Sequence, residues 1–194
     1  MVSTWSSCIE LPIQRLFLGI AASKSLKLYG GDAKDAYAHA PPSETPSYLS
    51  IDDQYADWYK HKYGKEIDRR QVLPIERALQ GHPESGKQWM RHIDGILDKL
   101  GFIKAKHDHS IYQMSHQEGD IFLLRQVDDF VLACRSEATS IEIFDRIGLA
   151  LQRPIEKEKN IVPFTKLGLV NDFNGIDNHQ CKEYIKISAE SYID

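Results

Sequence analysis

The spacing of apolar residues along this chain predicts a series of helices and strands. Apolar side chains recur every three or four residues between 84 and 100 and again between 138 and 151, which is the period of an amphipathic helix. Residues 9–24 also read as a helix. Short runs rich in β-branched and aromatic residues predict strands instead. These strands are expected at 26–32, 110–114, 121–126, 130–134 and 164–170, with a last hairpin near 172–188.

The order of these elements is strand, helix, strands, helix, strand, which is the order of a split βαβ sheet. We therefore predict an α+β fold in which an antiparallel sheet is backed by helices on one face. Residues 41–75 are rich in Pro, Tyr and Asp without a clean period, so an irregular insertion is expected there. The charged run 156–159 is expected to be a linker.

The amino-acid composition indicates the general class of protein. With 194 residues, of which 42% are hydrophobic and 27% charged, one domain over 1–194 with a real core is expected. Three widely spaced cysteines suggest neither a disulfide framework nor a zinc site, and they fit a reducing compartment. No apolar run approaches the length of a membrane span. An intracellular protein that is not secreted and has no membrane partner is therefore expected.

The clearest chemical signal is the adjacent pair Asp128 and Asp129, which lies between two apolar, strand-like runs. A tight turn is expected here, because Asp is a favoured turn residue. Two neighbouring anions at the edge of an apolar sheet repel each other and are poorly solvated. A divalent cation bound by oxygen ligands would compensate them. A solvated hairpin tip is the alternative, and these residues alone leave both open.

A second acidic segment begins at Asp32, at the end of the predicted strand 26–32. If that strand pairs beside the hairpin, Asp32 and Asp128 can face each other across the sheet. Three carboxylates that converge in this way can hold two Mg²⁺ ions roughly 4 Å apart. That arrangement clamps the attacking and leaving oxygens in phosphoryl transfer.

These residues carry a family resemblance that covers about residues 12–193: the chain resembles the reverse transcriptase of copia-type LTR retrotransposons. Residues 32–37, Asp-Ala-Lys-Asp-Ala-Tyr, resemble the family's first catalytic motif, Asp-x-Lys-x-Ala followed by an aromatic residue. Val127-Asp128-Asp129 resembles its Tyr-Val-Asp-Asp box. Further matches follow in the family's order: Leu79-Gln80-Gly81 with 84–89, Gly101-Phe102 with 108–112, and Leu167-Gly168 with 184–188 and 191–193.

The resemblance implies the palm of an RNA-directed DNA polymerase, with partial fingers at 41–75 and the start of a thumb. It implies that Asp32, Asp128 and Asp129 are the catalytic residues and bind two Mg²⁺ or Mn²⁺ ions. A primer 3′-hydroxyl would attack the α-phosphate of an incoming nucleotide, with metal and positioning supplying most of the catalysis. The implied partners are an RNA template, a DNA primer or hybrid, and deoxynucleoside triphosphates.

The same resemblance assigns substrate-binding residues. Tyr37 would lie beside the sugar and exclude a 2′-hydroxyl, with a core aromatic as the alternative interpretation. Asp35 and Ala36 would present backbone N–H groups to the triphosphate. The remaining assignments are Gln80 and Gly81 in the nucleotide pocket, Gln126 near the primer end, Lys87 at a phosphate or in solvent, and Leu167 and Gly168 as a primer grip.

The chain also departs from the family pattern. Gln126 stands where the family usually carries Tyr, which is compatible with altered fidelity and does not imply a loss of activity, and Gly86 stands where Pro is usual. A Lys-x-Arg segment of the fingers would lie before the first residue, and most of the thumb and an RNase H segment after the last. These polyprotein segments are expected as partners, in a cytoplasmic virus-like particle or in the nucleus.

The net charge of the chain argues against strong binding to nucleic acid. At −4, the chain lacks the basic character of most nucleic-acid enzymes, and weak binding to template by this chain alone is expected. Three functions remain open: a polymerase fragment, an inactive remnant that keeps the palm fold and weak nucleic-acid binding, and a different two-metal palm enzyme such as a nucleotide cyclase. Trp89 and the matches within 184–193 argue against the last.

Overall fold

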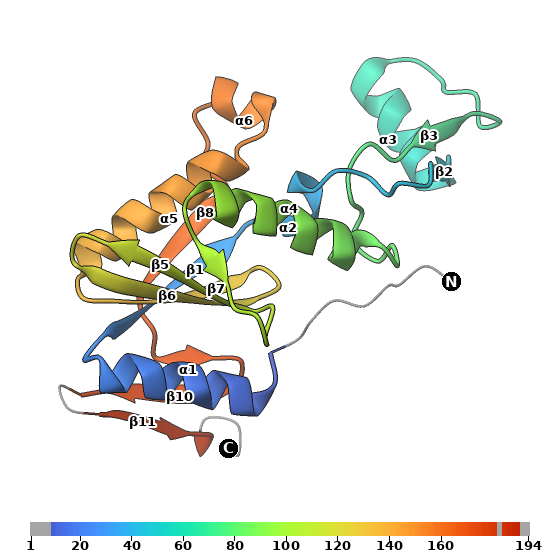
Figure 1. Cartoon of the computed structure of the whole chain (residues 1–194). Helices are drawn as coiled ribbons and strands as arrows, with labels where there is room; N and C mark the ends of the chain where they lie inside the picture. The colour runs from blue at the N-terminus through green and yellow to red at the C-terminus, as the bar shows by residue number, and fades with distance from the viewer. Residues whose placement is uncertain (1–8, 182–183, 191–194) are drawn as a thin grey trace.

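The structure is a computed structural model that describes residues 9–181 and 184–190. Its centre is a six-stranded antiparallel sheet in the order β4-β5-β6-β7-β1-β8 (Figure 1). The fold is therefore α+β with antiparallel pairing, as predicted. The strands of this sheet are β1 (Lys27–Ala33), β4 (Ile103–Lys104), β5 (Ile111–His116), β6 (Gly119–Gln126), β7 (Asp129–Cys134) and β8 (Phe164–Leu169).

Two long helices, α4 (Ser85–Lys99) and α5 (Glu137–Leu151), pack on one face of the sheet. Both were predicted, with ends that differ by one residue. In α4, side chains at four-residue steps form the buried stripe, and Trp89, Ile93 and Leu97 are each at most 1% exposed.

The prediction that helices cover only one face is wrong. α1 (Leu11–Ser23) packs on the opposite face, with a second sheet made of β9 (Asp172–Phe173), β10 (Ile176–Gln180) and β11 (Ile185–Ser188) beside it (Figure 1). The physical reason lies in β6 and β7, whose apolar runs are uninterrupted. Since alternate side chains point to opposite faces, Leu123 joins the core under α4 and α5 while Leu124 joins the core under α1.

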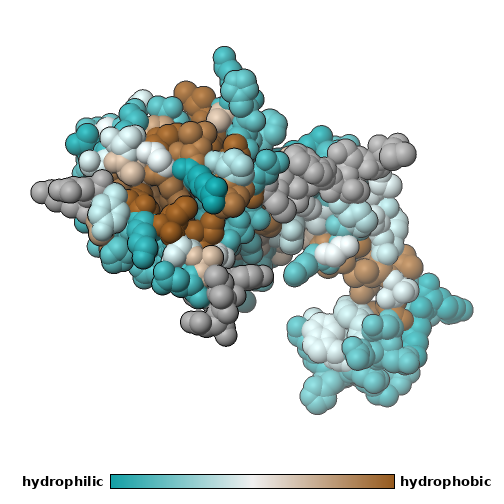
Figure 2. Space-filling view, turned by 90° about the horizontal axis from the view of Figure 1, so that it is seen from below, coloured by the Kyte–Doolittle hydropathy of each residue, from teal (hydrophilic) through white to brown (hydrophobic). Residues whose placement is uncertain are grey.

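Residues 41–75 also differ from the expected irregular insertion. They contain β2 (Tyr48–Ser50), α3 (Asp53–Tyr63) and β3 (Val72–Pro74), with β2 and β3 paired. The helix escaped prediction because only Ala56 of α3 is buried, so no apolar stripe marks it in the sequence. This β2–α3–β3 unit stands apart from the main sheet in Figure 1 and forms a separate mass in Figure 2.

Two short helices complete the fold. α2 (Ala36–His39) follows β1, and α6 (Pro154–Glu158) lies where a charged linker was expected. α6 forms because Glu156 folds back onto the backbone N–H and the guanidinium of Arg153 and becomes buried. No helix in the described part of the chain is both long and apolar enough to cross a membrane.

Candidate active site

The acidic residues singled out from the sequence lie together at one end of the β1–β7 pair. β1 runs antiparallel to β7, and the register sets Asp32 opposite Asp129. The backbone N–H of Ala33 donates to the carbonyl oxygen of Asp128 at 2.9 Å. The predicted pairing of this strand beside the hairpin is confirmed, with Asp129 rather than Asp128 as the residue directly opposite Asp32.

The turn between β6 and β7 is a two-residue hairpin loop with an unfavourable residue in it. Gln126 pairs with Asp129, which leaves only Val127 and Asp128 in the loop. Val127 has φ of 53°, a left-handed conformation that is unfavourable for a β-branched residue. Its carbonyl oxygen accepts a hydrogen bond from Trp89 Nε1 at 2.7 Å. The predicted turn is therefore present, and a side chain of α4 contacts it directly.

The carboxylates repel one another. Burial raises the pKa of Asp32, and the neighbouring charge of Asp128 raises it further, while Lys34 lowers it in part. Burial likewise raises the pKa of Asp129, followed by the charges of Asp128, Asp32 and Asp172. Within the described residues, no Lys or Arg forms an ion pair with Asp32, Asp128 or Asp129. Negative charge is thus concentrated with only partial compensation from Lys34, which favours a bound cation.

The donor set suits a hard divalent cation. Among residues 9–181 and 184–190, no group of three or more His, Cys, Asp or Glu side chains is arranged as a cage for a metal ion. Mg²⁺ does not require one, because it is usually held by one or two carboxylates and completes its shell with water and substrate phosphates. Oxygen-only ligands whose negative charges lie close together fit that type of site.

A cleft of about 360 Å³ opens on the side of Asp128 that faces α2. It brings together several residues that the sequence singled out for nucleotide binding. Asp35 has φ of 51° and precedes the first residue of α2. The residues lining this cleft are Asp35, Ala36, Tyr37, Ala38, Ala78, Leu79, Gln80 and Asp128.

A second cleft, of about 340 Å³, lies on the side of Asp129 that faces β8. Leu167, which is 59% exposed, lines it, while Gly168 has φ of 76° and pairs with Gly30 in β1. Asp172 also lines it, and no pattern in the sequence marked this residue. Asp128 thus borders the first cleft and Asp129 the second, while Asp32 lines neither.

Comparisons with known proteins agree with this geometry. The family model described as reverse transcriptase (RNA-dependent DNA polymerase) matches residues 1–194. The chain belongs to this family. The predicted resemblance to copia-type reverse transcriptases is thereby confirmed, and the family as a whole uses divalent metals.

The chain is also similar to a yeast protein that is named as a transposon protein. The Saccharomyces cerevisiae protein named "Putative transposon Ty5-1 protein" is 31% identical over 123 residues, which cover 63% of this chain. The chain matches only 36% of that relative's length, about a third. No solved structure was found to match the chain.

Several predicted site residues of the reverse transcriptase lie outside both clefts. The side chain of Gln126 accepts a hydrogen bond from the backbone N–H of Ile9 at 2.7 Å. Lys87 lies in the first turn of α4 and lines neither cleft. Gly81 follows the cleft residue Gln80, and its φ of 90° gives a conformational reason for glycine. The family match at 191–193 lies outside the described residues.

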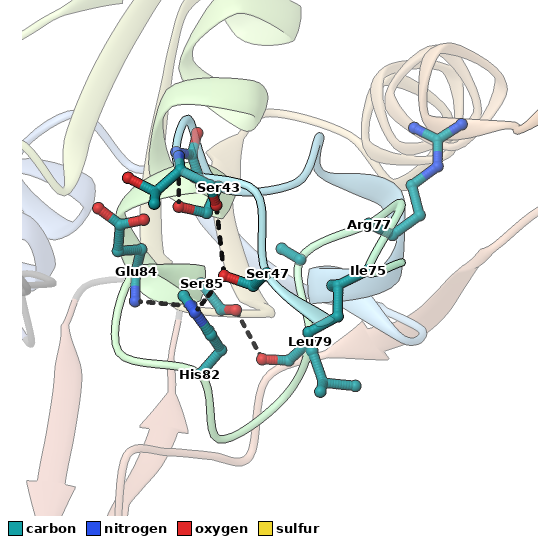
Figure 3. Close-up of a pocket in the computed structure, with 11 residues that line it drawn as sticks. Ser43, Ser47, Ile75, Arg77, Leu79, His82, Glu84 and Ser85 are labelled. Atoms are coloured by element: carbon teal, nitrogen blue, oxygen red, sulfur yellow. Dashed lines mark hydrogen bonds between the residues drawn. The ribbon is translucent and has the colours of Figure 1, made fainter. Parts of the chain in front are cut away.

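A small polar pocket fixes the loop that leads into α4 (Figure 3). Its volume of about 10 Å³ is enough for no more than about one water molecule. Ser85 Oγ donates to the carbonyl oxygen of Leu79 at 2.6 Å, and His82 Nε2 lies 3.4 Å from Ser47 Oγ. The pocket therefore serves as packing that holds Leu79 and Gln80 at the wall of the first cleft.

Two further residues support the site and were not predicted from the sequence. His39 is 2% exposed, and its ring nitrogens lie 3.0 Å from the carbonyl oxygens of Lys34 and Leu151, so it ties α2 to the end of α5. Gly31 lies under Phe164, where a Cβ atom would come within 2.5 Å of the ring. Consecutive glycines inside a predicted strand were the available signal for such a close approach.

Proposed function

We propose that this chain forms the palm of an RNA-directed DNA polymerase and that Asp32, Asp128 and Asp129 bind two divalent cations for nucleotidyl transfer. The register of β1 against β7, which sets Asp32 opposite Asp129, is the observation that carries the proposal. It brings Asp32 close to Asp128 and Asp129, which follow it by 96 and 97 residues, at one end of the β1–β7 pair, where Asp128 borders one cleft and Asp129 the other. Family membership supports the reaction class.

The two clefts suit the two substrates of the reaction. The incoming nucleotide would lie in the cleft formed by α2 and residues 78–80, where Tyr37 stands beside the sugar and excludes a 2′-hydroxyl. Asp35 and Ala36 would offer backbone N–H groups to the triphosphate. The primer end would lie in the other cleft, against Leu167, which lines it, and the adjoining Gly168.

The ionised carboxylates would bind the cations that the reaction needs. Bound Mg²⁺ or Mn²⁺ would stabilise negative charge on the attacking oxygen, the α-phosphate and the leaving pyrophosphate. Asp32 and Asp129 must be ionised to bind a cation, and their raised pKa values mean that this ionisation is completed at higher pH than for ordinary carboxyl groups. Activity should therefore fall when the pH drops toward these raised values.

The wider assignments form part of the same proposal. Residues 1–194 would make one palm-like domain, with 41–75 as a fingers-like unit and the C-terminal strands as the start of a thumb. The partners would be an RNA template, a DNA primer or hybrid, deoxynucleoside triphosphates and the remaining segments of a Pol polyprotein. A cytoplasmic virus-like particle or the nucleus is the proposed location.

Primer extension on poly(rA)·oligo(dT) tests the proposal, using the full-length protein that carries this sequence with Mg²⁺ or Mn²⁺. Asp128→Asn is expected to reduce extension by at least about a hundredfold, because removing an electrostatic contribution to the transition state costs on that order. Asp98→Asn, at an exposed acid of α4, is the matched control and should retain activity. Equal extension by the Asp128→Asn and wild-type proteins would overturn the catalytic assignment.

An inactive remnant that keeps the palm fold is the second candidate. The observation in its favour is that the described residues contain no preformed cage for a metal ion. It predicts weak binding to the primer–template without extension in either metal. Binding measured in parallel with extension therefore separates the two candidates.

A further inference from the structure

We propose that Trp89, assisted by Arg125, is a positioning residue that holds the Val127–Asp129 turn in its active geometry. This inference rests on the proposed polymerase function, because it assigns the turn a catalytic task. It concerns two side chains that touch neither cleft and act only through the backbone of Val127.

The turn needs support from outside because its backbone is unfavourable. Val127 is β-branched and has φ of 53°, where its side chain crowds its own backbone. In two-residue hairpin loops, positions with positive φ normally carry Gly, Asn or Asp. A strained residue of this kind persists only where several surrounding contacts hold its conformation, and such residues cluster at active sites.

Trp89 supplies that support. Its indole Nε1–H donates to the carbonyl oxygen of Val127 at 2.7 Å, across 38 residues of sequence. Trp89 is 1% exposed and packed in the core under α4, so the donor has little freedom to move. Because the Val127 carbonyl belongs to the peptide that leads into Asp128, fixing this carbonyl also orients the following carboxylate.

Arg125 adds a second, weaker donor. Its Nη1 lies 3.4 Å from the same carbonyl oxygen, and its side chain is 3% exposed. Its Nη2 lies 3.5 Å from the hydroxyl of Tyr112 and 4.0 Å from Asp94, while its Nε is buried without a hydrogen-bond partner among residues 9–181 and 184–190. A buried guanidinium so incompletely paired is costly to keep, and its link to the turn gives it a role.

The same helix also forms part of the nucleotide cleft. Ser85, at the start of α4, donates to the carbonyl oxygen of Leu79, and Leu79 lines the cleft beside Asp128. α4 therefore contacts the turn through Trp89 and a residue of the cleft wall through Ser85. One helix thus supports both the turn and the cleft that would hold the nucleotide.

The test is a double-mutant cycle in the full-length protein, read by primer extension. Trp89→Phe keeps an aromatic ring but removes the N–H donor, and we expect kcat to fall by about tenfold or more, since small displacements of reacting groups have effects of this size. Val127→Gly removes the steric reason for the support, because glycine adopts positive φ freely. In the Val127→Gly background, Trp89→Phe should therefore cost less than about threefold.

Trp58→Phe is the matched control, because Trp58 is 46% exposed on α3 and distant in sequence from the turn. It should leave kcat unchanged. If Trp89→Phe lowers kcat by the same factor with Val127 or Gly at position 127, Trp89 serves only as core packing and the inference is wrong.

A measurement on the unmodified protein covers the case in which Trp89→Phe fails to fold or the wild type extends no primer. In the proton NMR spectrum, the indole N–H resonance of Trp89 should lie downfield of the Trp58 resonance. Its chemical shift should also change less with temperature, as expected for a donor that is hydrogen-bonded to a carbonyl oxygen. A temperature dependence as steep as that of Trp58 would overturn the contact. If the contact is present but no extension occurs, the proposed function fails separately from it.

Discussion

The main sheet and the β2–α3–β3 unit are stabilised in opposite ways. At the carboxylate end of the sheet, contacts join distant segments: Trp89 to Val127, Ala33 to Asp128, and His39 to Leu151. In the smaller unit, the contacts join segments that are nearer in the chain, such as the exposed ion pair between Lys60 and Glu66. The geometry of the proposed site therefore depends on contacts between distant segments, whereas the smaller unit depends on contacts within residues 41–75.

Figure 2 shows a second contrast, between apolar surface on the main body and the largely polar surface of the smaller unit. On the main body, Leu11 and Leu16 of α1 are 43% and 55% exposed. In the unit, α3 exposes aromatic rings that stack on each other, with Tyr59 and Tyr63 centroids 4.8 Å apart. Such rings contribute less to stability than the buried core does, because water still reaches them.

The largest expected effect on stability comes from the core of the main sheet. Ile93→Ala removes a side chain that is 0% exposed, and we expect it to lower the free energy of unfolding by about 2–5 kcal/mol. Tyr63→Ala, at a 52% exposed ring of α3, should cost less than about 1 kcal/mol. Urea unfolding measures both. Similar losses for the two variants would show that the smaller unit is integrated into the core.

An intermediate effect is expected at the strand that carries Asp32. Gly31→Ala places a Cβ atom 2.5 Å from the ring of Phe164, and overpacking of this kind costs about 1–3 kcal/mol. Gly19→Ala is the control, because a Cβ there meets nothing within 4 Å and alanine favours the helix. Thermal unfolding compares them. A Gly31→Ala protein as stable as the Gly19→Ala protein would show that β1 shifts freely, contrary to a rigid site.

The smallest expected effect is electrostatic. Because burial and neighbouring charges raise the pKa of Asp129 above its ordinary 3.8, its stabilising contribution is complete below that pH and is lost as the pH rises through the raised value. At pH 7 without metal, Asp129→Asn should therefore raise the melting temperature, by no more than about 3 °C. At pH 3.5 the gain should disappear, and Asp98→Asn should show none at either pH. A lower melting temperature for Asp129→Asn at pH 7 would contradict the repulsion.

Local patterns in the sequence predicted the elements that bury a regular apolar stripe. The α4 stripe through Trp89 and Ile93 has the helical period, and the apolar runs that flank Asp128 and Asp129 are typical of strands. The pairing of the Asp32 strand beside the hairpin was a hypothesis that the order of the family motifs supported, and residue spacing alone did not establish it. The helices and strands were predictable because burial leaves an apolar stripe or an apolar run in the sequence.

Other features depend on contacts that no local pattern records. α3 buries only Ala56, so its helical period carries no apolar signal. The hydrogen bond from Trp89 Nε1 to the Val127 carbonyl oxygen is made to a residue whose backbone conformation is disfavoured for valine. Asp172 approaches Asp129 only through the return of the chain after β8. In each case tertiary structure, rather than sequence spacing, brings the groups together.

The convergence of Asp32, Asp128 and Asp129 on a divalent cation is the central claim, and metal-dependent thermal stability tests it most directly. Millimolar Mg²⁺ should raise the melting temperature of the wild-type protein by mass action, since the cation binds the folded state. Asp32→Asn should abolish most of that shift, whereas Asp98→Asn should keep it. No shift in the wild-type protein, or an equal shift in the Asp32→Asn protein, would contradict the claim.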